Sequence, residues 1–448
     1  MKTMKEYKKR LLQIAVPIML SNVISNIQML IDKIFLGRLD VLFMSAVGNA
    51  TAPLWTTMSV NFALGMGSSI LISQSVGEGK LEKAQDYAAS MFVFHNVLPV
   101  LMFLFWTFAS PLVFTLMGVA DSVKGYCVTY TRLFAPIFLL SGFGCTMSTI
   151  LQTSNNTKPL VWYGLIRSVI NIFLDWALIF GKFGLPAMGI AGAALGTTIA
   201  EYIGAVYITI VVIKDKNLKT MPSFAQIRRA RFAEYWQSVK LGVNSCLEDF
   251  AWNMGNLVLI SLLNTISELA AGIYSIVFSI EVLAGIVMGA LGSGTMTLTG
   301  EATGARDQKT FRSVVGTAYL WAAVVSAFTL VMALLFPKQI LSIFTTDRAI
   351  IESSALYLVL VSCNLFSKSA NVVVGNGIRG YGDTRWMFFT QILGTVGIIS
   401  VSSLCISVFK WGMIGAFVAV LTDEAVRAII NTARFLFLRV DAPPFTSA

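Results

Sequence analysis

The sequence is poor in the residues on which catalytic and metal sites depend. Its 448 residues include a single histidine, His95, and five scattered cysteines. One imidazole rules out a histidine-cluster metal site and argues against a histidine-based catalytic triad, and the odd number of cysteines favours free thiols over disulfides. We therefore expect no enzyme, no cofactor and no metal site built on histidine or cysteine.

Charge is scarce as well, and apolar residues are abundant. Asp, Glu, Lys and Arg make up 12 % of the chain and hydrophobic residues 56 %, whereas ordinary soluble domains carry about twice as much charge. At roughly 20 apolar residues per crossing, this content fills about twelve membrane spans. The apolar runs lie near 11–36, 50–76, 88–113, 128–151, 160–181, 187–213, 235–264, 270–299, 313–336, 351–377, 387–409 and 412–438. The predicted fold class is an all-α integral membrane protein with twelve transmembrane helices.

The excess of positive charge, +10 in total, lies mainly in alternate loops. The N-terminal tail, the segment from Lys214 to Arg231 and the C-terminal end all carry basic residues. By the positive-inside rule these segments are cytoplasmic, so both termini are predicted to be inside and the number of crossings is even. We expect a multi-pass protein of the plasma membrane, the inner membrane in a bacterium, with lipid as its surroundings and no nucleic-acid partner.

The two halves of the chain repeat each other. An offset of 227 residues places Gly65-Met66-Gly67 on Gly292-Ser293-Gly294, and an offset of 223 places Gly189 and Glu201 on Gly412 and Glu424. Each half then holds six spans, which predicts two six-helix lobes related by a parallel pseudo-two-fold repeat. The predicted domains are an N-terminal lobe (1–213), a basic cytoplasmic linker (214–234) and a C-terminal lobe (235–448). Two such lobes are typical of alternating-access transporters, and a channel is disfavoured without being excluded.

Two acids in the first lobe are candidate ion ligands. Asp32 precedes Arg38 by about six residues and Asp175 precedes Lys182 by about seven, so both lie roughly 10 Å below the outer surface. Asn171 lies one helical turn from Asp175, and oxygen ligands suit hard cations. The alternative is that these acids only cap a buried polar network, for example with Arg167.

Several motifs are similar to those of the multidrug and toxic compound extrusion (MATE) transporters. They are Asp32-Lys33-Ile34-Phe35-Leu36-Gly37-Arg38-Leu39, Gly65-Met66-Gly67 with Ser73-Gln74-Ser75-Val76-Gly77, the run from Gly189 to Thr197, and the run from Gly377 to Arg385. The resemblance covers nearly the whole chain. It implies a monomeric exporter of amphipathic, often cationic organic compounds, driven by inward flow of sodium or protons. It also implies a coupling-cation site at Asp32, Asn171, Asp175 and Thr197, with Tyr130 as a polar neighbour.

The second lobe carries its own intramembrane charges: Glu248, Asp249, Glu281 and Lys368. We hypothesise that Lys368 is held by one or both of Glu248 and Asp249, and so replaces a cation site with a built-in counter-charge. The alternative is that these residues face a wet cavity unpaired. The spacing of Asp423 and Glu424 from Arg427 permits an internal ion pair, and Glu281 and Glu201 are expected to stay free to attract a cationic substrate.

The remaining rival functions differ in the charges they need. A lipid-linked saccharide flippase of the same wider superfamily would be expected to have a strongly basic cavity for pyrophosphate, whereas most charges within these spans are acidic. A membrane-embedded enzyme would need a clustered nucleophile and base, which this sequence lacks.

Overall fold

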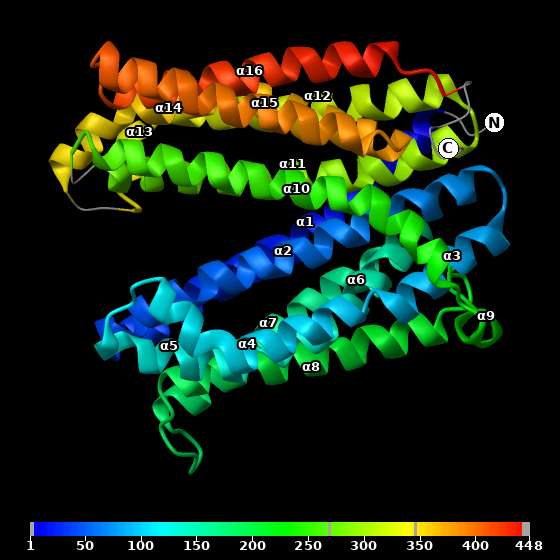
Figure 1. Cartoon of the computed structure of the whole chain (residues 1–448), viewed down its shortest axis with the longest axis horizontal. Helices are drawn as coiled ribbons and strands as arrows, with labels where there is room; N and C mark the ends of the chain where they lie inside the picture. Colours follow the sequence, from blue (N-terminus) through cyan, green and yellow to red (C-terminus); the bar gives the residue numbers. More distant parts are fainter. Residues whose placement is uncertain (1–3, 268–269, 345–346, 441–448) are drawn as a thin grey trace. The chain divides into compact units, whose positions relative to one another are not determined.

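All regular secondary structure in the described part of the protein is helical. The computed structural model describes residues 4–267, 270–344 and 347–440, and all regular elements in these ranges are helices (Figure 1). The first half holds α1 (Met4–Gly37), α2 (Val41–Gly77), α3 (Leu81–Phe94), α4 (Val97–Leu116), α5 (Asp121–Phe134), α6 (Ile137–Thr153), α7 (Lys158–Phe180), α8 (Ile190–Lys214) and α9 (Phe224–Arg228). The second half holds α10 (Phe232–Asn264), α11 (Ala270–Gly304), α12 (Gln308–Leu335), α13 (Pro337–Leu341), α14 (Arg348–Tyr381), α15 (Thr384–Ser403), the π-helix η1 (Leu404–Val408) and α16 (Met413–Phe437).

Each of the twelve predicted spans coincides with one helix or with two consecutive ones. By length and composition alone, eight helical segments of the described chain could cross a membrane, or nine if the bent pair of α5 and α6 forms one span. The other three, α2, α10 and α16, have 37, 33 and 25 residues. At 1.5 Å per residue they too are long enough for a hydrocarbon core of about 30 Å. The all-α membrane fold is thus confirmed.

Two of the spans are broken, which the apolar runs do not reveal. α5 and α6 meet at an angle of 45° around Pro136, which cannot donate a backbone hydrogen bond. Between α3 and α4, the Asn96 side chain donates to the carbonyl of Phe92 at 2.7 Å. Such side-chain contacts with the backbone are common where helices bend.

The repeat between the halves is visible in the backbone. Gly189 precedes α8 with φ 52° and ψ −125°, and Gly412 precedes α16 with φ 58° and ψ −139°. Glycine adopts this positive φ without a steric penalty, and other residues rarely do. The two glycines are the pair that the offset of 223 aligns, so the sequence repeat corresponds to equivalent helix starts.

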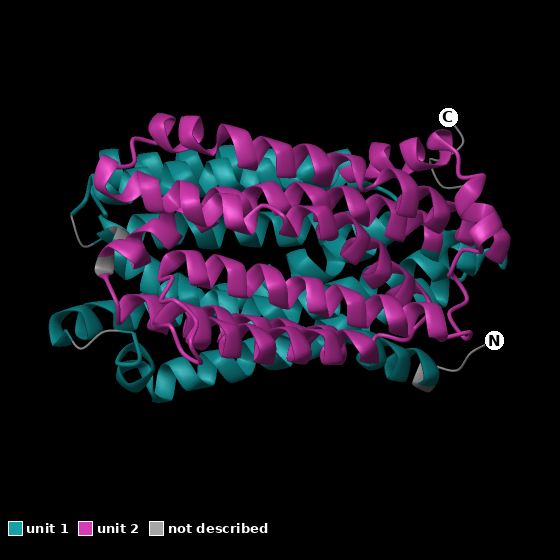
Figure 2. Ribbon diagram, turned by 90° about the horizontal axis from the view of Figure 1, so that it is seen from below, with its two compact units in different colours: residues 1–15, 73–79, 243–448 teal, residues 16–72, 80–242 magenta. Residues whose placement is uncertain are grey.

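The chain forms two compact units, coloured separately in Figure 2. Unit 1 comprises residues 1–15, 73–79 and 243–448, and unit 2 comprises residues 16–72 and 80–242. In unit 2, α7 packs against α8, and in unit 1, α14 packs against α11, α12 and α16. The first turns of α1 belong to unit 1, where Arg10 donates to both Glu301 carboxylate oxygens at 2.8 and 2.7 Å.

Candidate functional site: an oxygen-lined cluster in unit 2

Four of the predicted cation ligands meet in unit 2. Asp32 lies on α1, Asn171 and Asp175 on α7, and Thr197 on α8. The Asn171 amide donates to the Asp175 carboxylate and to the Thr197 hydroxyl, each at 3.2 Å. The Asp32 and Asp175 carboxyl groups lie close enough to interact directly. Three helices therefore bring these polar groups to one place.

Close packing of α7 and α8 makes this arrangement possible. A Cβ atom on Gly196 would lie 2.2 Å from the Asp175 carboxylate, so a larger residue there would displace the carboxylate. Asn171 and Asp175 are both fully buried. Burial among helices holds these oxygens in a low-dielectric environment, where two facing carboxylates repel unless a proton or cation lies between them.

Three oxygen atoms of the cluster have no hydrogen-bond partner among the described residues. They are Oδ1 of Asp32, Oδ1 of Asn171 and Oδ2 of Asp175. Leaving a buried polar atom unpaired costs about 1–3 kcal/mol. Carboxylate and amide oxygens are also the ligands that hard cations prefer. The cluster can therefore accept a small cation or a proton.

Tyr130 on α5 is the fifth predicted residue. Its ring is buried and stacks on Phe134 with 5.9 Å between the centroids. Its hydroxyl lies within electrostatic range of Asp32 and Asp175. Tyr130 is thus a neighbour of the cluster, as the resemblance implies.

Sequence reasoning missed two residues that orient the cluster. Gln28 donates to Oδ2 of Asp32 at 3.1 Å and accepts a hydrogen bond from the Ser168 hydroxyl at 3.3 Å. Gln28 lies one turn before Asp32, and Ser168 one turn before Asn171. Residues three or four apart share a helix face, so polar side chains at this spacing from the two ligands were the available signal.

Arg167 does not pair with the acids of this cluster. Its Nη1 binds Oε2 of Glu201 at 3.0 Å, and the Tyr163 hydroxyl donates to the same carboxylate. Glu201 is therefore not the free acid that the sequence led us to expect. The pairing is possible because Arg167 on α7 faces Glu201 on α8, an inter-helix contact that spacing along one helix does not reveal.

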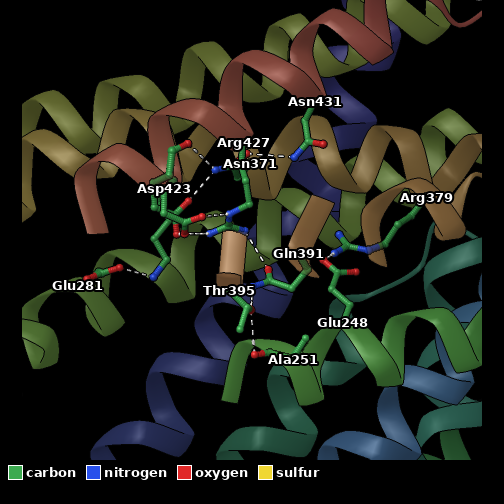
Figure 3. Close-up of polar contacts among 12 residues, drawn as sticks. Glu248, Ala251, Glu281, Asn371, Arg379, Gln391, Thr395, Asp423, Arg427 and Asn431 are labelled. Carbon is green, nitrogen blue, oxygen red and sulfur yellow. Dashed lines mark hydrogen bonds and ion pairs between the residues drawn. The ribbon is translucent and has the colours of Figure 1, made fainter. Parts of the chain in front are cut away.

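The charges of unit 1 pair differently from our hypothesis (Figure 3). Lys368 on α14 binds Glu281 on α11, and Glu248 on α10 binds Arg379 of α14 at 2.5 Å. The predicted pairing of Lys368 with Glu248 or Asp249 is thus wrong, and Glu281 is not free. Asp249 lies next to Glu248 and within electrostatic range of Arg379. Lys368 and Arg379 lie three turns apart on α14, and each binds an acid of a different neighbouring helix.

The ion pair predicted within the last span is confirmed. Arg427 binds Asp423 at 2.8 Å and Glu424 at 3.0 Å, all on α16, and donates to Gln391 of α15 at 2.9 Å.

These charges line a pocket in unit 1. Its other lining residues include Lys368, Glu281, Trp252, Tyr274 and Phe278. The pocket therefore carries three acids against two bases, and each base has an acid partner.

The family model described as MatE matches residues 17–177 and 245–404, one segment in each half. This chain belongs to the MatE family. Its members are transporters, and it is accordingly a multi-pass membrane transporter and not an enzyme. Among the curated relatives, a probable multidrug resistance protein NorM of Thermotoga maritima is 26 % identical over 96 % of this chain and 92 % of its own.

Further similarities extend over nearly all of this MatE chain. The uncharacterized transporter YisQ of Bacillus subtilis is 23 % identical, over 90 % of both chains. Among solved structures, a MOP superfamily transporter from Pyrococcus furiosus superposes with a TM-score of 0.88 at 18 % identity, covering 98 % of this chain and 97 % of that one. An outward-facing multidrug resistance MATE family transporter gives 0.86 at 18 % identity, covering 96 % of each chain. These structures share the fold.

Proposed function

We propose that this MatE protein is a secondary active exporter of amphipathic, often cationic organic compounds, coupled to inward flow of sodium or protons. Relatives named as multidrug resistance proteins support the export of drugs. The observation that carries the coupling is the cluster in unit 2, where buried oxygens of Asp32, Asn171 and Asp175 lack partners. A cation or proton bound there neutralises two facing carboxylates.

Alternating access then requires only that the cation and the organic substrate prefer different conformations of the protein. If the cation stabilises one conformation and the organic substrate the other, each weakens the binding of its competitor. We propose that the protein works in this way as a monomer in the plasma membrane, with both termini in the cytoplasm.

A lipid-linked saccharide flippase is the second candidate. Recognition of a pyrophosphate would favour unpaired basic groups. In the described residues of unit 1, however, Lys368, Arg379 and Arg427 all bind acids, which supports the drug exporter over the flippase.

The test measures dye efflux from reconstituted vesicles, with a sodium gradient and a proton gradient imposed separately. We expect one of the two gradients to drive efflux, and Asp32→Asn or Asp175→Asn to reduce this at least tenfold while membrane insertion is retained. The matched control is Asp121→Asn, because that side chain is 92 % exposed and pairs with Lys124 on its own helix. Unchanged gradient-driven efflux in both cluster variants would refute the site.

A further inference from the structure

A second group of charges lies in unit 2, apart from the cation ligands. Arg167 and Glu201 join α7 to α8 through the ion pair already described, and their side chains are 21 % and 16 % exposed. Arg167 also donates from Nη2 to the Ser25 hydroxyl of α1 at 2.5 Å. The guanidinium of this α7 residue thus contacts α1 and α8, the other two helices that supply cation ligands.

Arg167 lies at a defined distance from those ligands. On α7 it precedes Asp175 by eight residues, and on α1 its partner Ser25 precedes Asp32 by seven. Such spacings keep residues on one helix face, and at 1.5 Å per residue they correspond to roughly 10 Å along the axis. A unit charge at this separation acts on a buried carboxylate through protein with little water between them.

The Arg167–Glu201 ion pair has a fixed orientation, with the arginine bonded to the helix that carries Asp32. Arg167 is hydrogen-bonded to α1, the helix of Asp32, whereas Glu201 accepts its hydrogen bonds from Arg167 and Tyr163 of α7. The residue next to Arg167, Ser168, bonds Gln28 and through it Asp32. Arg167 is therefore held at a fixed place by the same scaffold that holds Asp32.

We propose that Arg167 is a positioning residue that weakens cation binding at the Asp32–Asp175 cluster, and that Glu201 limits this effect by neutralising the guanidinium. The inference rests on the proposed function, since it concerns the same cation site. A transporter must release its driving ion as well as bind it, and a nearby fixed positive charge lowers the affinity without occupying a ligand position. Through water-poor protein, a unit charge at roughly 10 Å changes the affinity by about tenfold.

Opposite shifts in two single variants would distinguish this role from a structural one. Glu201→Gln leaves the arginine charge uncompensated, so the half-saturating sodium or proton concentration for dye efflux should rise about tenfold. Arg167→Gln leaves the glutamate charge instead, so that concentration should fall by a similar factor. The double variant carries neither charge and should return to within about threefold of the wild type. Sodium- or pH-dependent thermal stabilisation of the purified protein gives a second readout that needs no transport.

The matched control is Tyr163→Phe. It removes one hydrogen bond to Glu201 and keeps both charges, so we expect no shift in half-saturation. The double variant also serves as a reference for folding, because it leaves no unpaired buried charge. If a single variant fails to accumulate, the other single variant compared with the double one still gives the sign of the shift.

The inference is overturned if both single variants shift half-saturation in the same direction, or if neither shifts it. This result can be told apart from failure of the proposed function. If Asp32→Asn and Asp175→Asn abolish gradient-driven efflux while the Arg167 and Glu201 variants shift nothing, only the tuning role is wrong. If the aspartate variants keep normal coupling, the cation site itself is wrong.

Discussion

Lys368 places a positive charge in the interior of unit 1, and its ammonium group binds the Glu281 carboxylate of α11. The ammonium also lies 5.7 Å from the centre of the Phe278 ring. Removing one partner of a buried ion pair leaves the other charge uncompensated, which is strongly destabilising at about 3–5 kcal/mol. The pair therefore links α14 to α11 by charge as well as by packing.

Lys368→Met should for this reason lower the thermal unfolding temperature of the purified protein, and adding Glu281→Gln should recover part of the loss. The double variant removes both charges, so no lone carboxylate stays buried. The control combination, Lys368→Met with Asp249→Asn, should give no recovery, because Asp249 is not the partner. Equal losses in the two double variants would contradict the pairing.

The candidate site could be predicted in part from single residues. Asp32 and Asp175 were found because each lies a similar distance before a basic outer-loop residue. Thr197 and Tyr130 came from family resemblance alone. The partner of Lys368 could not be predicted, since Glu281 lies 87 residues away and the meeting depends on how α14 and α11 are rotated about their axes.

Helices α2 and α11 approach closely where both end in unit 1. A Cβ atom on Gly304 would lie 1.9 Å from the carbonyl oxygen of Gln74, and one on Gly77 would lie 2.0 Å from that of Glu301. Backbone atoms cannot move aside as a flexible side chain can, so each position needs glycine for packing. These two contacts set the distance between the helix ends.

Gly304→Ala should accordingly destabilise unit 1, by about 1–3 kcal/mol as is typical of overpacking. Thermal unfolding of the purified protein measures this as a lower midpoint. Gly316→Ala is the control on α12, because a Cβ atom there meets no atom within 4 Å. The control should be neutral or slightly stabilising, since alanine favours helix. If Gly316→Ala lowers the unfolding midpoint as much as Gly304→Ala does, the close contact at Gly304 is not the cause of the destabilisation.

At the level of elements, hydropathy predicted where helices occur but not where they break. The run 128–151 is two helices bent around Pro136, and the run 88–113 is α3 and α4. Apolar composition continues through both breaks, because a bent span must still face lipid along its length. Only local backbone chemistry, such as the proline, marks the bend.

For the whole molecule, the distribution of basic residues predicts which loops lie in the cytoplasm. In a background with the five native cysteines replaced by alanine, we expect Lys216→Cys to react with a membrane-impermeant maleimide only after cells are permeabilised. Phe183→Cys, between α7 and α8 and 72 % exposed as phenylalanine, should react in intact cells. The reverse pattern would show that the orientation is inverted.

The overall architecture was the most predictable level. Total apolar content gave about twelve spans, and the repeat gave equivalent helix starts at Gly189 and Gly412. These features depend on sums over many residues, so errors at single positions matter little. The pairing of individual charges depends on how each helix is rotated about its axis. Apolar content and sequence repeats carry no information about that rotation.

During biosynthesis, the ion pairs within α16 can form earlier, relative to the synthesis of their partners, than the pair between Lys368 and Glu281. Arg427 meets Asp423 and Glu424 within one helix, at four and three residues' separation, so these charges can neutralise one another as the nascent helix leaves the translocon. Glu281, by contrast, is synthesised 87 residues before Lys368. Until α14 is made, α11 therefore carries this acid without its basic partner, and we expect insertion of α11 to depend more on neighbouring helices than insertion of α16 does.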